Sequence, residues 1–261
     1  MMQLYDALTM RVRELLSRLS PKIYSYDAAK AWPETKNFEM IFQKDAAFEL
    51  GGGNKASVNL TCVTGTAELF TKWQNPACAV PTSQVFVYGP DLQEIQGEVN
   101  YARICEVLVR EDAVRYAENA DQTLKLLQDI DFVKFHVYGK GFMMRTSGQS
   151  EREPVRVAKK ALRDGITFER MGDAFISHYK KNPNVLAVRV SFITADAFDY
   201  EELAKEAKKT VEIRNSLSKI QKGLPTECSV CDIREICNEV TGLRELHFGK
   251  KERREKDPAA D

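Results

Sequence analysis

The sequence predicts an α+β protein in which a mixed sheet carries flanking helices and is followed by a small cysteine-rich metal-binding segment. Two observations concern the first 224 residues. Short runs of β-branched and aromatic residues predict strands, and longer runs with helical spacing are interspersed with them. The two kinds of element do not alternate regularly, as they would in a βαβ protein. The third observation is that three of the six cysteines fall within ten residues near the end of the chain.

Residues 1–20 predict an amphipathic N-terminal helix. Apolar side chains recur at helical spacing, and Ser20-Pro21 ends the pattern. The single apolar face of this helix has to be covered, so the helix needs a partner, which is either the rest of the chain or a second chain. This face consists of Leu4, Leu8, Val12, Leu15, Leu16 and Leu19.

The α+β domain is predicted at residues 35–224. Gly51-Gly52-Gly53-Asn54 is a turn between two strands, Pro154 suits the first turn of a helix, and Asp199 can cap the longest helix. Strands are expected at 37–43, 56–64, 84–88, 101–109, 132–138 and 185–193. Helices are expected at 113–127, 153–163, 171–181 and 200–222, and 69–81 is expected to be irregular.

Residues 225–248 form the cysteine-rich segment, in which Cys228, Cys231 and Cys237 precede His247. A Cys-x2-Cys pair places two thiolates on one turn, at the separation that a tetrahedral metal or an iron–sulfur cluster requires. A third thiolate and an imidazole can complete the ligand set. The spacing leaves three alternatives open: a cluster bound by His247, a cluster with an open iron position, and a structural zinc site.

Composition and charge exclude several classes of protein. Lys+Arg and Asp+Glu both total 38, so the net charge is zero and no basic surface for general nucleic-acid binding is indicated. No apolar run is long enough to cross a bilayer, and residues 1–20 lack the pattern of a signal peptide. We therefore expect a cytoplasmic protein, whose reduced thiols favour metal binding over disulfides. The basic, apolar-poor residues 249–261 predict a disordered charged tail.

Three further cysteines and one run of cations remain. Cys62 and Cys105 lie in apolar strand patterns and are expected in the core, whereas Cys78, in an irregular segment, is the weaker candidate for a fourth ligand. The cations form either a solvated helix face or a docking site for an acidic partner or for CoA phosphates. They are Lys140, Arg145, Arg152, Arg156, Lys159, Lys160 and Arg163.

The order of several short blocks resembles the acetyl-CoA synthase subunit of the carbon monoxide dehydrogenase/acetyl-CoA synthase complex. The resemblance covers the middle domain of that subunit and the start of its metal-binding domain, from about Phe38 to His247 of this chain. No single block is specific, and the shared order carries the resemblance. The blocks are 48–54, 87–92, 138–142, 147–149, 156–161, 165–168, 172–173 and 188–194.

The resemblance implies a [4Fe-4S] cluster held by Cys228, Cys231 and Cys237, with His247 at the position of the family's fourth cysteine. It also implies contacts of the α+β domain with CoA and ferredoxin, although Met143 stands where the family has an aromatic residue near the CoA region. The chain contains no Cys-Gly-Cys, the motif that holds the family's nickel ions, so we do not expect it to be an acetyl-CoA synthase by itself.

The function that follows from the resemblance is that of an accessory, docking or electron-transfer component in anaerobic one-carbon or corrinoid metabolism. Its expected partner is a ferredoxin, a corrinoid protein or another subunit of the complex. Two alternatives stay open. One is a catalytic subunit that uses an open iron position together with a partner, and the other is a zinc-stabilised scaffold protein.

Overall fold

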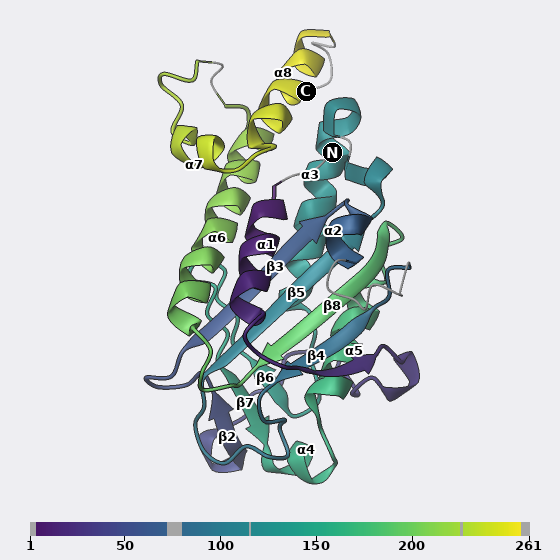
Figure 1. The fold of residues 1–261 in the computed structure, drawn as a ribbon, viewed down its shortest axis with the longest axis vertical. Helices are drawn as coiled ribbons and strands as arrows, with labels where there is room; N and C mark the ends of the chain where they lie inside the picture. Colours follow the sequence, from purple (N-terminus) through teal and green to yellow (C-terminus); the bar gives the residue numbers. More distant parts are fainter. Residues whose placement is uncertain (1–3, 72–79, 115, 225–226, 257–261) are drawn as a thin grey trace.

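The structure, a computed structural model, describes residues 4–71, 80–114, 116–224 and 227–256 (Figure 1). A five-stranded sheet with the order β1-β4-β8-β5-β3 forms its centre. β4 runs parallel to β8 and β3 parallel to β5, whereas β5–β8 and β1–β4 are antiparallel. The predicted mixed sheet with flanking helices is therefore confirmed. The strands are β1 (Lys22–Ser25), β3 (Ser57–Thr64), β4 (Gln84–Tyr88), β5 (Tyr101–Val109) and β8 (Val185–Ile193).

Helices cover both faces of this sheet. Phe192 of β8 stacks on Phe168 of α5 (Phe168–Tyr179), with ring centroids 4.6 Å apart. Arg189, three residues earlier, reaches a carboxylate that also binds Arg13 of α1 (Asp6–Leu16). Side chains alternate between the two faces of a strand, so residues three positions apart point to opposite faces. α5 and α1 therefore lie on opposite sides of the sheet. The long helix α6 (Tyr200–Lys222) contacts both β3 and α1.

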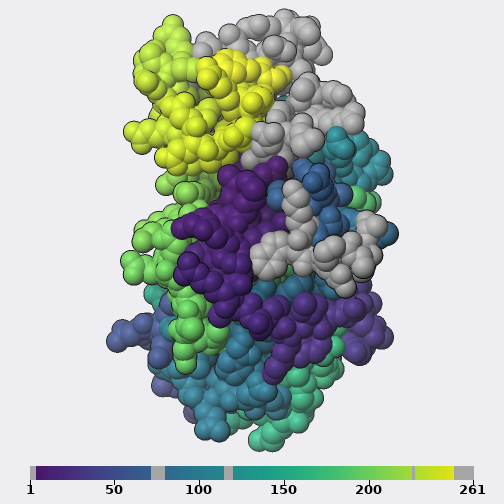
Figure 2. Space-filling view, viewed as in Figure 1, coloured from purple at the N-terminus to yellow at the C-terminus, as the bar shows by residue number. Residues whose placement is uncertain are grey.

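The partner of the N-terminal helix is the body of the chain itself. Leu8, Val12 and Leu16 are buried in the same core as the central strands. The purple N-terminal segment lies across the middle of the molecule in Figure 2. No second chain is needed to cover the apolar face predicted for this helix.

A second, smaller antiparallel sheet has the order β2-β7-β6. Its strands are β2 (Ala46–Leu50), β6 (Phe142–Met144) and β7 (Val155–Ala158), and the short helix α4 (Lys159–Arg163) follows β7. The helix predicted at 153–163 is therefore wrong in its first half. Val155 and Val157 are fully buried and alternate with the half-buried Arg156, which is the two-residue period of a strand.

Two predicted strands are also wrong. Residues 37–42 form no regular element, Gln43 begins a 3-10 turn, and the strand of this region begins only at Ala46. Residues 132–138 contain the end of α3 (Tyr116–Phe132) and a 3-10 turn at Val133–Phe135. Another short helix, α2 (Ala67–Thr71), starts the segment predicted to be irregular. Cys78 lies outside the described residues.

The C-terminal segment folds back onto the body through α7 (Arg234–Glu239) and α8 (Leu243–Lys256), and α8 packs against α3 and α6. Leu243 and Leu246 are fully buried in the main core. The disorder predicted from Gly249 is wrong as far as Lys256, because α8 continues through residues that are good helix formers. Residues 257–261 lie outside the described part. Within the described chain, no helix has both the length and the apolar character needed to cross a membrane.

Candidate metal centre

Three different pieces of local structure carry the predicted ligands. Cys228 lies in a turn in which the Val230 amide donates to the Glu227 carbonyl at 3.3 Å. Cys231 precedes the next turn, and Cys237 belongs to α7, where its amide donates to the Ile233 carbonyl at 2.9 Å. His247 belongs to α8. The turn and both helices are therefore needed to assemble one site.

The structure brings all four predicted ligands to the wall of one hollow of about 370 Å³. Cys228 is exposed, Cys231 and Cys237 are half-buried, and His247 is buried. The hollow lies between α7, α8 and the turn before α7, at the end of the molecule coloured yellow in Figure 2. The remaining lining residues are Ser229, Arg234, Asn238, Arg244 and Phe248.

The four donors surround a space rather than a single point. Among the described residues, no three or more His, Cys, Asp or Glu side chains converge closely enough to hold one metal ion. A zinc site would require all of its donor atoms at about 2.0–2.3 Å from the same ion. A cluster of several irons keeps its thiolates farther apart, because each thiolate binds a different iron. The described residues thus show a shared hollow without a converged set of ligands.

The charges around the hollow are mixed but include two guanidinium groups. Burial raises the pKa of the Cys237 thiol, the nearby Cys231 raises it further, and Arg244 lowers it. Cys228 also raises the pKa of the Cys237 thiol. Arg234 and Arg244 also line the hollow. Both keep their charge at all ordinary pH values, and they can compensate the negative charge of a thiolate-bound metal.

The other described cysteines belong to the core, as predicted. Cys62 of β3 and Cys105 of β5 are 2% and 0% exposed, and burial raises the pKa of each thiol. Cys105 accepts a hydrogen bond from Nη1 of Arg103 at 3.0 Å inside the main sheet. Neither residue lines the hollow of the predicted ligands.

The basic run does not form one helix face. Arg145 and Arg156 both pair with Glu49 across the second sheet, the Arg156 Nε atom at 2.7 Å. Arg152 and Lys159 donate to main-chain carbonyls, at 3.4 Å and 2.9 Å. The other members of the run, Lys140, Lys160 and Arg163, are exposed, and no ion pair involves them among the described residues.

Sequence reasoning missed two features of this region. Glu49 pairs with two of the cations, and only strand pairing across the second sheet brings it to them. A row of exposed apolar side chains, at Phe38, Met40 and Phe42, lies beside the remaining cations. The apolar residues within 38–42 could be seen in the sequence, but they indicated a strand paired in a sheet rather than an exposed segment.

The chain matches no protein-family model and no curated protein. The resemblance to acetyl-CoA synthase therefore stays a prediction made from the sequence.

Proposed function

We propose that this chain is an iron–sulfur protein in which Cys228, Cys231 and Cys237 hold a [4Fe-4S] cluster, with His247 beside the fourth iron. The observation that carries the proposal is that these four residues, drawn from a turn and two helices, line one hollow. Thiolates are the ordinary ligands of iron–sulfur clusters, and imidazole is a known substitute. Such a cluster would supply the storage and transfer of single electrons.

The chain's own residues would hold the cluster, limit its contact with water and balance its charge. Cys228 is exposed, so its side of the hollow would be the one nearest to a redox partner. His247, within α8, is buried, and the Phe248 ring stacks on its imidazole with ring centroids 5.5 Å apart. Arg234 and Arg244 would offset the negative charge of the thiolates.

The role we propose is that of a cytoplasmic accessory, docking or electron-transfer component of anaerobic one-carbon or corrinoid metabolism. Its support is the sequence resemblance together with the gathered donor set. A ferredoxin, a corrinoid protein or a subunit of the carbon monoxide dehydrogenase complex is the class of partner that this role requires.

The test is metal and sulfide analysis of protein purified without oxygen, together with its visible and electron paramagnetic resonance spectra. Replacing Cys228, Cys231 or Cys237 by Ser should remove most of the iron, because a neutral hydroxyl is a poor substitute for a thiolate. Ser229→Ala, within the same turn, is the matched control and should keep it. Full metal content in all three cysteine variants would end the proposal, and colourless protein with stoichiometric zinc would favour the scaffold alternative.

A second candidate function is catalysis at an iron that has no cysteine ligand. It is favoured by the fact that only three thiols line the hollow in the described part of the chain. His247→Cys separates the two functions. If His247 binds iron, the variant should keep the cluster at a lower reduction potential, since a thiolate adds negative charge. If the iron is open, cyanide should alter the resonance spectrum of the natural protein and should no longer do so in the variant.

A further inference from the structure

The segment that precedes β2 presents a row of apolar side chains to solvent. Phe38, Met40 and Phe42, here called the apolar stripe, are 45%, 63% and 61% exposed, whereas Ile41 between them is buried. Three of the nine large apolar side chains exposed in the described chain thus fall within five residues. Single exposed apolar residues are ordinary, but a contiguous group indicates an interaction site.

Contacts on the inner side of the segment hold the stripe outward. The Ile41 carbonyl accepts a hydrogen bond from Nη1 of Arg156 at 3.2 Å, and the Ile41 amide lies 3.1 Å from the Met143 sulfur. Glu39 accepts a bond from the Gly141 amide at 3.1 Å, and the Phe42 carbonyl accepts one from the Asp45 amide at 2.9 Å. The exposed side chains are therefore presented by an anchored backbone, which lowers the entropy lost on binding.

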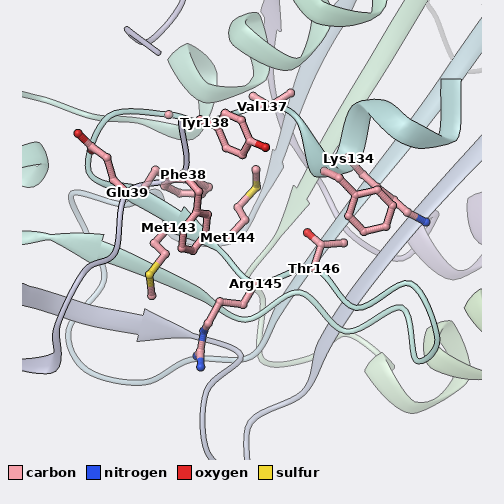
Figure 3. A pocket seen from close by; sticks show the side chains of 12 residues that line it. Phe38, Glu39, Lys134, Val137, Tyr138, Met143, Met144, Arg145 and Thr146 are labelled. Carbon is pink, nitrogen blue, oxygen red and sulfur yellow. The ribbon is translucent and has the colours of Figure 1, made fainter. Parts of the chain in front are cut away.

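Two hollows adjoin the stripe, one at Phe38 and the other at Met40. Phe38 lines one of about 270 Å³, together with Tyr138, Met143 and Met144 (Figure 3). Figure 3 shows the Phe38 ring among these side chains, with Glu39 at one edge and Arg145 at another.

Met40 lines the other hollow, of about 450 Å³, beside Trp32 and two alanines of the β7–α4 region. The Arg170 guanidinium stacks on the Trp32 ring, 4.4 Å from the ring centroid. A bound segment could place apolar side chains into both hollows while its backbone crosses the stripe.

Exposed lysines without ion-pair partners adjoin the stripe. Lys36, Lys44, Lys140 and Lys160 are exposed, and none has an ion-pair partner within 4.0 Å among the described residues. The second hollow itself is lined by Lys140 and Lys160 together with Glu39, Asp45 and Asp164. Cations exceed carboxylates once the adjoining exposed residues Lys36, Lys44 and Arg163 are counted with them. A partner that covers this surface should therefore carry acidic residues beside its apolar ones.

We propose that the apolar stripe and the lysines around it are the docking surface for an acidic segment of a partner protein, whose apolar side chains enter the two hollows. A second copy of this chain is a poorer occupant, because it would bring a surface with the same excess of lysines. In Figure 1, β2 and α4, which adjoin this surface, lie at the opposite end of the molecule from α7, so this contact would hold a partner away from the cysteine-rich segment. The proposal does not depend on the metal centre.

The experiment selects peptides from a random-peptide display library on the intact purified chain and measures their affinity by fluorescence anisotropy. The selected peptides should combine Asp or Glu with aromatic or aliphatic residues. Met40→Ser and Phe42→Ser should each weaken their binding by about tenfold or more, since each removes a large buried apolar contact. Met10→Ser, at a side chain of similar exposure on α1, is the control and should leave the affinity unchanged.

The charge part of the proposal has its own variants. Lys140→Glu combined with Lys160→Glu should weaken binding, and added salt should weaken it in the natural protein, because exposed charges are screened beyond about 8 Å at physiological ionic strength. Lys208→Glu on α6 is the matched control. Selection of peptides without acidic residues, or peptides whose affinity ignores the stripe variants, would overturn the proposal. So would a dimer in sedimentation that the stripe variants abolish, because a second copy would then be the occupant.

Discussion

Asp173 is a single residue whose environment sets a measurable pH dependence. Its side chain is fully buried in α5, and Oδ1 accepts a hydrogen bond from the Asp27 amide at 3.2 Å, while Oδ2 has no partner in the structure. Burial raises the pKa of this carboxyl from 3.8 to about 6, against the opposing effect of that hydrogen bond. Nearby Glu169 and Asp27 also raise the pKa.

The shift predicts that Asp173 favours the folded state more as the pH falls. In the folded protein Asp173 binds its proton as the pH falls through about 6, whereas in the unfolded chain it does so only near 3.8. The free energy of unfolding therefore rises as the pH falls between these two values and gains nothing further from Asp173 below 3.8. The difference between the two pKa values corresponds to about 3 kcal/mol. Asp173→Asn cannot titrate and should lack this gain. Urea unfolding of both proteins between about pH 7 and pH 4 tests it, and an equal pH dependence in the two would contradict it.

At the scale of elements, buried ion pairs join strands to their neighbours on both faces of the main sheet. Arg103 of β5 binds Glu153, which precedes β7, through two bonds of 2.7 Å and 2.5 Å, and both side chains are fully buried. On the other face, Glu106 of β5 accepts from Arg13 of α1 at 2.9 Å and from Arg189 of β8 at 2.8 Å. These pairs connect the second sheet and the N-terminal helix to β5.

Removal of one member of the Arg103–Glu153 pair should destabilise the fold strongly. Glu153→Ala leaves a buried guanidinium without its carboxylate, and the expected loss is about 3–5 kcal/mol in the free energy of unfolding. Asp112→Ala, which breaks an exposed pair with Arg110, should cost less than about 1 kcal/mol. Chemical denaturation measures both. A Glu153 variant no less stable than the Asp112 variant would show that the buried pair does not hold the two sheets together.

At the scale of the whole molecule, the cysteine-rich segment is part of the main core rather than an appendage. Leu243 and Leu246 of α8 share one apolar cluster with Leu4, Leu8 and the central strands. The path from α6 through the predicted ligands to α8 closes back onto α3 and α6. Metal bound between α7 and α8 would therefore link a turn with few apolar contacts to a well-packed helix.

Loss of metal should accordingly loosen one region of the molecule. Anything that binds only the folded state stabilises it, and here the stabilised part is the turn at 227–233 together with α7. Hydrogen exchange of the metal-loaded and metal-free protein should differ most in these residues and least in β5, which is buried along its entire length. A uniform change, or faster exchange confined to the sheet, would disagree with a metal site in the C-terminal segment.

Local sequence was sufficient for the elements that are buried throughout or capped clearly. β4, β5 and β8 match their predicted bounds, because each is a run rich in β-branched and aromatic residues, and Asp199 caps α6 by accepting from the Glu202 amide at 2.9 Å. The grouping of Cys228, Cys231 and Cys237 could also be read from their spacing, which a turn and a short helix keep close.

Pairing between distant residues determined the rest. Pro154 suits the first turn of a helix, but residues 155–158 form β7, because β2 and β6 offer hydrogen-bonding edges to them. Residues 37–43 have strand composition but no sheet partner, which leaves the apolar stripe exposed. His247, Arg234 and Arg244 reach one hollow only because α8 turns back onto α3 and α6. Such contacts depend on surfaces that meet after folding, and no short window of sequence contains both of their members.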